Sequence, residues 1–242
     1  MADIVELRRE KGFLDIVLTD PDGGNLISNA EGDRIVTALA DLDGVQLVRI
    51  RSTGKAFCLG RVSPTPKPGT PGITGQFLKS VVAEPAIRVY LALSAAPVPV
   101  LCVVRGAAEG YGFGLVASSD IALVGSDACF SITEMARNIP PTLVMTALLD
   151  RAPAKLVAHL VLSQEKLDAA RAAELGLVSK VVDDAALDAE MEALTETILT
   201  YRLEVVRAIK EYLRFSEGRD RAAAGSYAAN LAASALSARF GG

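Results

Sequence analysis

Three closely spaced glycines mark a place where backbone groups could do chemistry. In the stretch EGYGFG, Gly110, Gly112 and Gly114 alternate with Tyr111 and Phe113. An apolar run typical of a strand precedes them, and an apolar, small-residue run typical of a helix follows. The first N–H groups of such a helix are free and lie at the positive end of its dipole, so they could stabilise a developing oxyanion.

Two other interpretations of these glycines stay open on the residues alone. A dinucleotide-type phosphate loop needs the spacing G-x-G-x-x-G, whereas the spacing here is G-x-G-x-G. Glycines can also simply let a helix pack closely on a strand. An oxyanion site normally needs two donors. The segment STGKAFCLGRV (52–62), which directly follows another expected strand, is where we look for the second donor.

Side chains suited to metal or triad chemistry are scarce. The single histidine, His159, lies in an apolar helical pattern, which argues against a Ser-His-Asp triad and against most metal sites. Cys58, Cys102 and Cys129 have no CxxC spacing and lie among apolar residues, so we expect buried, reduced thiols.

Length and composition set the broad class. The chain has 242 residues, half of them hydrophobic, which allows one large domain or one domain with a small appendage. The net charge is −4 and no Lys/Arg block occurs, so no nucleic-acid partner is expected. No apolar run reaches the ~18 residues of a membrane span, and the N-terminus lacks an apolar signal core. We therefore expect a cytoplasmic protein with no membrane partner.

The first half of the chain alternates strand and helix signals. Strands are expected over 12–19, 45–52, 98–106 and 120–125, and a helix over 28–44. Ser28 and Glu31 have capping-box spacing at the start of that helix, and an apolar stripe follows at helical spacing. Nearly continuous apolar strands between helices predict an α/β fold whose sheet is covered on both faces.

The rest of the chain is more helical. Four prolines and four glycines in residues 60–75 predict a long surface loop, and a helix is expected over 76–96. Residues 167–182 predict a short helix, with Asp168 as its N-cap and Gly176 just past its end, and then a strand. Helix dominates from Asp184 to about Arg239, with Gly218 and Gly225 as candidate breaks.

Three segments together carry a resemblance to a family. GKAFCLG, then PVPVLCVVRGAAEGYGFGLVASSDIALVGSDACFSITE, then LDAARAAELGLVSKVV resemble, in order and spacing, the enoyl-CoA hydratase/isomerase (crotonase) family. The resemblance implies a spiral of ββα units over 1–183 and a C-terminal helical oligomerisation region over 184–242. It also implies a homotrimer or a dimer of trimers.

The family stabilises the enolate of an acyl-CoA thioester with two backbone N–H groups. By resemblance, these donors are the N–H groups of Leu59 and Tyr111. Coenzyme A enters as part of the substrate, and no separate cofactor or metal is implied. The residues expected to line the substrate come from the same two segments: Ala56, Phe57, Gly60, Arg61, Glu109, Gly110 and Gly112.

Two carboxylates move protons in the family's hydratases, and this chain matches one of them. Glu134 ends the ACFSITE stretch and occupies one position, whereas Gly114 stands at the other. Hydration is best served by two carboxylates, whereas moving a double bond needs one base that removes a proton and returns it nearby. Glu109 could replace the missing carboxylate from another direction, or it could face solvent.

Two further departures from the family pattern concern the substrate. The family's G-x-D is GRV here, and Arg61 could meet a phosphate of coenzyme A or a substrate carboxylate, or it could be an exposed loop residue. Pro140 and Pro141 replace the glycines of a turn that shapes the acyl pocket, and the proline-rich loop 63–72 also departs.

These residues support several hypotheses about activity. Double-bond isomerisation with Glu134 as the single acid–base group is favoured, and enoyl-CoA hydratase is the family-level alternative. Decarboxylation or C–C hydrolysis could use the same enolate, with Arg61 holding an acid. A pseudo-enzyme that binds acyl-CoA without turnover is the hypothesis of a different class.

Overall fold

The main sheet of the protein has six strands, in the order β1-β2-β3-β4-β6-β9. The computed structural model describes residues 3–67, 69–149 and 151–237. β1 is antiparallel to β2, and the other neighbours are parallel. The strands are β1 (Val5–Glu10), β2 (Phe13–Leu18), β3 (Leu47–Ser52), β4 (Val100–Val104), β6 (Ile121–Gly125) and β9 (Lys180–Val182).

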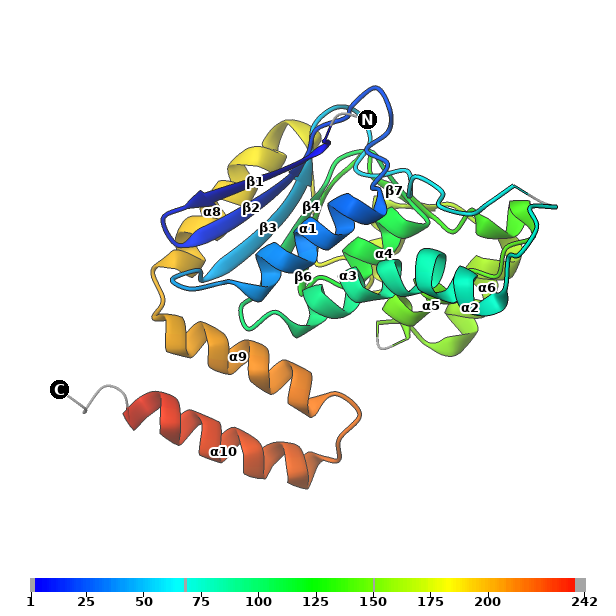
Figure 1. The fold of residues 1–242 in the computed structure, drawn as a ribbon. Helices are drawn as coiled ribbons and strands as arrows, with labels where there is room; N and C mark the ends of the chain where they lie inside the picture. Colours follow the sequence, from blue (N-terminus) through cyan, green and yellow to red (C-terminus); the bar gives the residue numbers. More distant parts are fainter. Residues whose placement is uncertain (1–2, 68, 150, 238–242) are drawn as a thin grey trace.

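A second, three-stranded sheet and the helices complete the fold (Figure 1). The small sheet has the order β5-β7-β8, with β5 (Ala107–Glu109), β7 (Cys129–Ser131) and β8 (Leu167–Asp168). The α-helices are α1 (Asn29–Ala40), α2 (Gly75–Leu78), α3 (Glu84–Ala95), α4 (Tyr111–Ala117), α5 (Thr142–Leu148), α6 (Ala154–Ser163), α7 (Ala169–Glu174), α8 (Leu187–Leu199), α9 (Leu203–Ser216) and α10 (Arg221–Ser237). A π-helical turn (Lys79–Ala83) joins α2 to α3, and 3₁₀ turns lie at Glu134–Arg137 and Asp184–Ala186.

Both faces of the main sheet are buried, as the apolar strands predict. Alternate strand residues point to opposite faces. Val48 and Ile50 pack with the apolar faces of α1 and α3, whereas Leu47 and Leu101 pack with α8. Figure 1 shows α1 and α3 on one side of the sheet and α8 on the other.

Local signals located most of these elements correctly. The four expected strands correspond to β2, β3, β4 and β6. The predicted capping box of α1 is present. The Ser28 N–H donates to the Glu31 carboxylate at 2.6 Å, and the Glu31 N–H donates to Ser28 Oγ at 3.3 Å. The helix ends at Ala40 and not at 44. Asp168 caps α7 as predicted, and its side chain accepts from the N–H of Arg171.

Other expectations were incomplete or wrong. β1 was not predicted, because four of its six residues are charged and it forms an edge of the sheet. Gly218 does separate α9 from α10, but Gly225 lies inside α10 and breaks nothing. The expected helix end near Arg239 lies outside the described residues. Cys58 and Cys102 are buried and Cys129 is partly buried, and all three are free thiols.

The C-terminal helices attach to the core in two ways. α8 follows residue 183 but belongs to the core, because Leu187, Met191 and Ile198 pack on the sheet. α9 contacts the core through Lys210, and α10 packs against α9 (Figure 1). No helix in the described ranges is both long and apolar enough to cross a membrane.

Candidate active site

The N-terminus of α4 presents a free backbone donor. Gly110, at φ +49°, donates its own N–H to the Ser131 carbonyl oxygen at 2.9 Å. The next residue, Tyr111, begins α4, and its N–H has no acceptor in the part of the chain that the structure describes. The predicted donor at Tyr111 is therefore available to a ligand oxygen.

A second segment, residues 56–61, lies directly against this helix start. Cys58 forms a parallel bridge with Ala108, and its carbonyl accepts the Glu109 N–H at 2.9 Å. A Cβ on Gly112 would lie 2.1 Å from the Cys58 carbonyl oxygen. Gly112 therefore allows the two backbones to approach this closely, which is the packing role that the sequence left open.

The prediction that Leu59 supplies the second donor is contradicted by the hydrogen bonding. The Leu59 N–H donates to the Gly24 carbonyl oxygen at 2.9 Å and is already engaged. Arg61 is the better candidate. It forms a parallel bridge with Ile27 through the Gly60 carbonyl and the Val62 N–H, so its own N–H points to the opposite side. No acceptor for the Arg61 N–H lies among the described residues.

Glu134 reaches the same place from the start of a 3₁₀ turn. A Cβ on Gly110 would lie 2.6 Å from Glu134 Oε1, so the carboxylate lies against the residue that precedes the Tyr111 donor. Glu134 Oε2 is buried and has no hydrogen-bond partner within the described ranges. Burial raises the pKa of this carboxyl group, backbone N–H groups and Arg137 lower it, and the charge of Glu109 raises it further.

Glu109 lies at the end of β5, close enough to Glu134 to influence its pKa. Its side chain is 23% exposed and forms an ion pair with Lys166 at 3.7 Å. The structure thus brings the second candidate acid near the site, but with Lys166 as its cationic partner.

The Arg61 guanidinium is half-buried and is not a free loop group. It donates to the Val82 carbonyl oxygen at 2.8 Å and to the Asn29 side-chain oxygen. It also lies 5.4 Å from the ring centroid of Tyr111. These partners are neutral, so they leave the positive charge beside the site uncompensated.

Three other residues that were predicted to bind substrate, Ala56, Phe57 and Gly60, have structural roles in the 56–61 segment. The Ala56 carbonyl accepts from Asn25 Nδ2 at 3.0 Å and from Ser52 Oγ at 3.1 Å. Phe57 has no exposed surface and packs in the core, which argues against the predicted contact of its side chain with substrate. Gly60, at φ +134°, adopts a backbone conformation that favours glycine.

Tyr90 is a residue near the site that the sequence did not reveal. Its hydroxyl donates to the Tyr111 carbonyl oxygen at 3.2 Å, and the two rings stack with centroids 5.2 Å apart. A Cβ on Gly114 would lie 2.1 Å from the Tyr90 hydroxyl oxygen. On the sequence Tyr90 is one apolar position of a helix, and no local signal separates it from ordinary core aromatics.

Groups suited to other chemistries lie elsewhere. His159 is exposed and its Nε2 lies 2.7 Å from a Glu165 carboxylate oxygen on the protein surface. Within residues 3–67, 69–149 and 151–237, no cluster of three or more His, Cys, Asp or Glu side chains could hold a metal ion.

Comparison with known families identifies this arrangement. The model of the enoyl-CoA hydratase/isomerase family matches residues 8–235, nearly the whole chain. The chain belongs to the enoyl-CoA hydratase/isomerase family. The glycine stretch, the 56–61 loop and Glu134 all lie within the matched residues.

Relatives within the family differ in their named reactions. A 1,2-epoxyphenylacetyl-CoA isomerase of Escherichia coli is 25% identical over 228 residues, which cover 90% of this chain and 84% of the relative. A Mycobacterium tuberculosis protein named as a (7aS)-7a-methyl-1,5-dioxo-2,3,5,6,7,7a-hexahydro-1H-indene-carboxyl-CoA hydrolase is 29% identical over 208 residues. This match covers 85% of this chain and 82% of the relative. Family membership therefore leaves the reaction itself open.

A solved structure confirms the crotonase-type α/β fold. A Thermobifida fusca YX protein, solved in complex with acetoacetyl-CoA, superimposes with a TM-score of 0.83 at 26% identity. The match covers 98% of this chain and 95% of that one. The predicted fold class is thereby confirmed.

Proposed function

We propose that this protein stabilises the enolate of an acyl-CoA thioester and moves a double bond, with Glu134 as its single general acid–base group. The observation that carries the proposal is the position of Glu134: its buried carboxylate lies against Gly110, one residue before the free N–H of Tyr111. A base beside an anion-stabilising donor is the arrangement that proton abstraction next to a carbonyl needs.

The proposed reaction uses groups of this chain throughout. The N–H groups of Tyr111 and Arg61 donate to the thioester oxygen, which gains negative charge when a proton leaves the substrate. Glu134 takes the proton from one carbon of the acyl group and returns it two carbons away as the double bond moves. Losing one such donor typically costs about 3 kcal/mol of transition-state stabilisation.

Double-bond migration is favoured over hydration because the second carboxylate is missing. Gly114 offers no side chain, and the Tyr90 hydroxyl fills the space that one would occupy. A water molecule would then have one carboxylate, Glu134, to orient and deprotonate it. Proton return by the same carboxylate needs no second acid.

Exchange of substrate protons in D₂O tests this proposal. Saturated, 2-enoyl- and 3-enoyl-CoAs are incubated with the protein, and deuterium at the α and γ carbons is followed by mass spectrometry. We expect α and γ labelling with double-bond migration, and a loss of at least about 100-fold in Glu134→Gln. Binding without exchange on any of these thioesters would favour the pseudo-enzyme.

C–C hydrolysis is a second candidate, favoured by the uncompensated charge of Arg61. Its guanidinium has neutral partners and could hold a substrate carboxylate through paired hydrogen bonds. The bond between a ketone and the α carbon would break after water adds to the ketone, leaving an enolate on the thioester. Release of a carboxylic acid from a β-ketoacyl-CoA, lost in Arg61→Gln, would support this reaction.

We propose the assembly from the exposed surface of the C-terminal helices and the location from composition. A homotrimer or dimer of trimers is supported by Ile209 and Leu213 on α9, each 55% exposed, and by Leu236 on α10, 52% exposed. Light scattering of the intact protein tests this assembly. A cytoplasmic location and the absence of a nucleic-acid partner stay predictions.

A further inference from the structure

The Tyr90 side chain contacts both the ring and the backbone carbonyl group of Tyr111. The Tyr90 side chain comes from α3 and is 2% exposed. Its ring stacks on that of Tyr111 at an interplanar angle of 28°, and its hydroxyl donates to the Tyr111 carbonyl oxygen at 3.2 Å. Burial raises the pKa of the Tyr90 phenol, so the hydroxyl stays protonated and remains a donor at neutral pH.

Gly114 is explained by the space that Tyr90 takes. Its φ is not in the left-handed region, so its backbone conformation does not require glycine. A Cβ there would lie 2.1 Å from the Tyr90 hydroxyl oxygen and 2.3 Å from Cζ. Glycine inside a helix costs about 1 kcal/mol relative to alanine. The chain accepts this cost at a position where any side chain would displace Tyr90.

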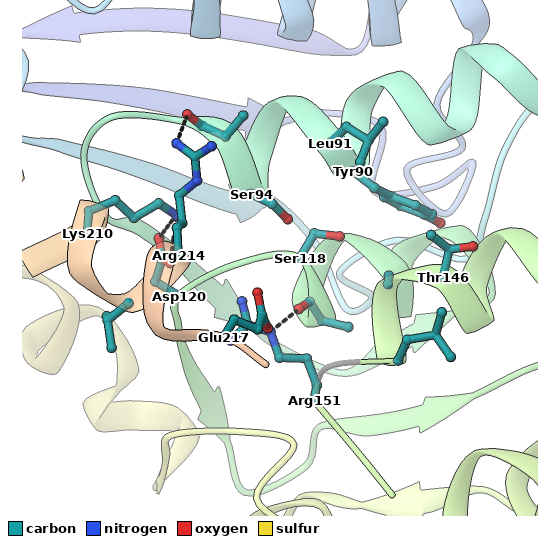
Figure 2. Close-up of a pocket in the computed structure, with 15 residues that line it drawn as sticks. Tyr90, Leu91, Ser94, Ser118, Asp120, Thr146, Arg151, Lys210, Arg214 and Glu217 are labelled. Carbon is teal, nitrogen blue, oxygen red and sulfur yellow. Dashed lines mark hydrogen bonds and ion pairs between the residues drawn. The ribbon is translucent and has the colours of Figure 1, made fainter. Parts of the chain in front are cut away.

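Tyr90 also lines a cavity. Its volume is about 600 Å³, and α3, α4, α5 and α9 line it. Figure 2 shows Tyr90 on its wall with Ser118 and Thr146. The stacking on the Tyr111 ring and the hydroxyl bond to the Tyr111 carbonyl oxygen are the contacts that hold the Tyr90 side chain against Tyr111.

We propose that Tyr90 is a positioning residue that holds Tyr111, and that Gly114 is glycine to leave space for its hydroxyl. This inference rests on the proposed function, in which the Tyr111 N–H is an oxyanion donor. A misaligned donor stabilises the developing charge less, while binding of the rest of the acyl-CoA is unaffected. Loss of the Tyr90 hydroxyl therefore lowers kcat and leaves KM nearly unchanged.

Two single variants and their double variant test this role, with acetoacetyl-CoA as the probe. The enolate of this β-keto thioester absorbs in the near ultraviolet, so a pH titration reads how strongly the site stabilises it without any turnover. Tyr90→Phe removes the hydroxyl, and Gly114→Ala pushes the ring away. Tyr227→Phe and Gly225→Ala are the matched controls: the Tyr227 hydroxyl bonds Glu211 on the surface, and a Cβ on Gly225 meets nothing within 4 Å.

We expect Tyr90→Phe and Gly114→Ala to weaken the same step, the stabilisation of the enolate. Tyr90→Phe lowers the kcat of deuterium exchange roughly three- to tenfold, which is the effect of one lost hydrogen bond. KM stays within about twofold, and the ionisation of bound acetoacetyl-CoA moves back toward that of the free thioester. Gly114→Ala has the same effect, the double variant is no worse than the more affected single variant, and the two controls behave as wild type.

The outcomes separate this inference from the proposed function. Wild-type protein that binds acetoacetyl-CoA without shifting its ionisation would refute the oxyanion site, and the role of Tyr90 with it. A wild-type shift that Tyr90→Phe and Gly114→Ala retain in full would leave the proposed function standing and overturn the role of Tyr90. A fall in Tm or a rise in KM, with kcat and the enolate shift unchanged, would mark Tyr90 as merely structural and would also overturn it.

Discussion

At the scale of single residues, the site is governed by one carboxylate in a poorly solvated position. Glu134 Oε2 is buried and has no hydrogen-bond partner among the described residues, and the nearby charge of Glu109 opposes ionisation of Glu134. Lys166 forms an ion pair with Glu109. Burial is the main cause that raises the pKa of Glu134, and a raised pKa would suit the proposed role of a group that takes and returns a proton.

The raised pKa of Glu134 has a testable pH dependence. The ionised form is the base, so exchange falls as pH drops through this pKa, and we expect the midpoint above the ordinary glutamate value of about 4.3. Glu109→Gln removes a like charge and should lower the midpoint while changing the plateau rate by less than about threefold. The pH–rate profile of deuterium exchange measures both quantities.

A control and a contrary result complete this test. Glu190→Gln alters an exposed carboxylate that pairs with Lys180 on the surface, and it should leave the midpoint in place. If Glu109→Gln instead abolished exchange at every pH, Glu109 would be a second proton-transfer group and hydration would become the favoured reaction.

At the scale of elements, the site depends on two backbone segments that meet without side chains between them. The loop after β3 lies against Gly106, which directly precedes β5, and against Gly112 in the first turn of α4. A Cβ on Gly106 would lie 1.8 Å from the Lys55 carbonyl oxygen, and one on Gly112 would lie 2.1 Å from that of Cys58. This close approach places the Arg61 segment beside the Tyr111 donor.

Gly112→Ala should therefore damage both stability and activity. The added Cβ meets backbone, which cannot rotate away as a side chain can, so we expect unfolding to become easier by about 1–3 kcal/mol. Denaturant titration measures this change, and deuterium exchange should fall with it. Gly225→Ala is the matched helical control and should be neutral or slightly stabilising, since its Cβ has open space. Equal stability of the two variants would contradict the close contact.

At the scale of the whole molecule, a buried ion pair ties the C-terminal helices to the sheet. Lys210 on α9 has 1% of its side chain exposed, and its Nζ lies 2.6 Å from each carboxylate oxygen of Asp120. Asp120 also accepts the Val100 N–H at 2.8 Å, at the start of β4. Burial lowers the pKa of Lys210, and Asp120 opposes that shift. This pair, together with Val206 packed against the sheet, connects α9 to the core.

Breaking this pair should loosen the C-terminal helices. Lys210→Met leaves Asp120 buried without its cation, and we expect a loss of about 3 kcal/mol in the free energy of unfolding. Lys180→Met, which removes an exposed partner of Glu190, should cost less than about 1 kcal/mol. Denaturant titration compares the two variants, and light scattering reports whether the assembly changes. A Lys210→Met protein as stable as the Lys180→Met protein would show that α9 does not depend on the ion pair.

Much of the fold and part of the site could be predicted from the sequence. Hydrophobic periodicity located the four inner strands, and the Ser28 and Asp168 caps located two helix starts. These signals are local: they reflect hydrogen bonds within one element and the side of it that faces the core. The order of three short motifs indicated the family, and the motifs themselves contain the glycine stretch and Glu134. These features could be predicted because each lies within one short segment of the sequence.

The identity of the second backbone donor was decided by tertiary structure. Whether an N–H is free depends on the strand or turn that passes beside it, and that neighbour comes from a distant part of the chain. Leu59 is engaged by Gly24, whereas Arg61 points its N–H away from Ile27. The same reason explains why Tyr90 escaped notice: its partner is 21 residues away, and only packing brings its hydroxyl to Tyr111. The sequence by itself determined the family and most of the elements, and it singled out Glu134 as the candidate base. The packing of distant segments determined which groups surround Glu134.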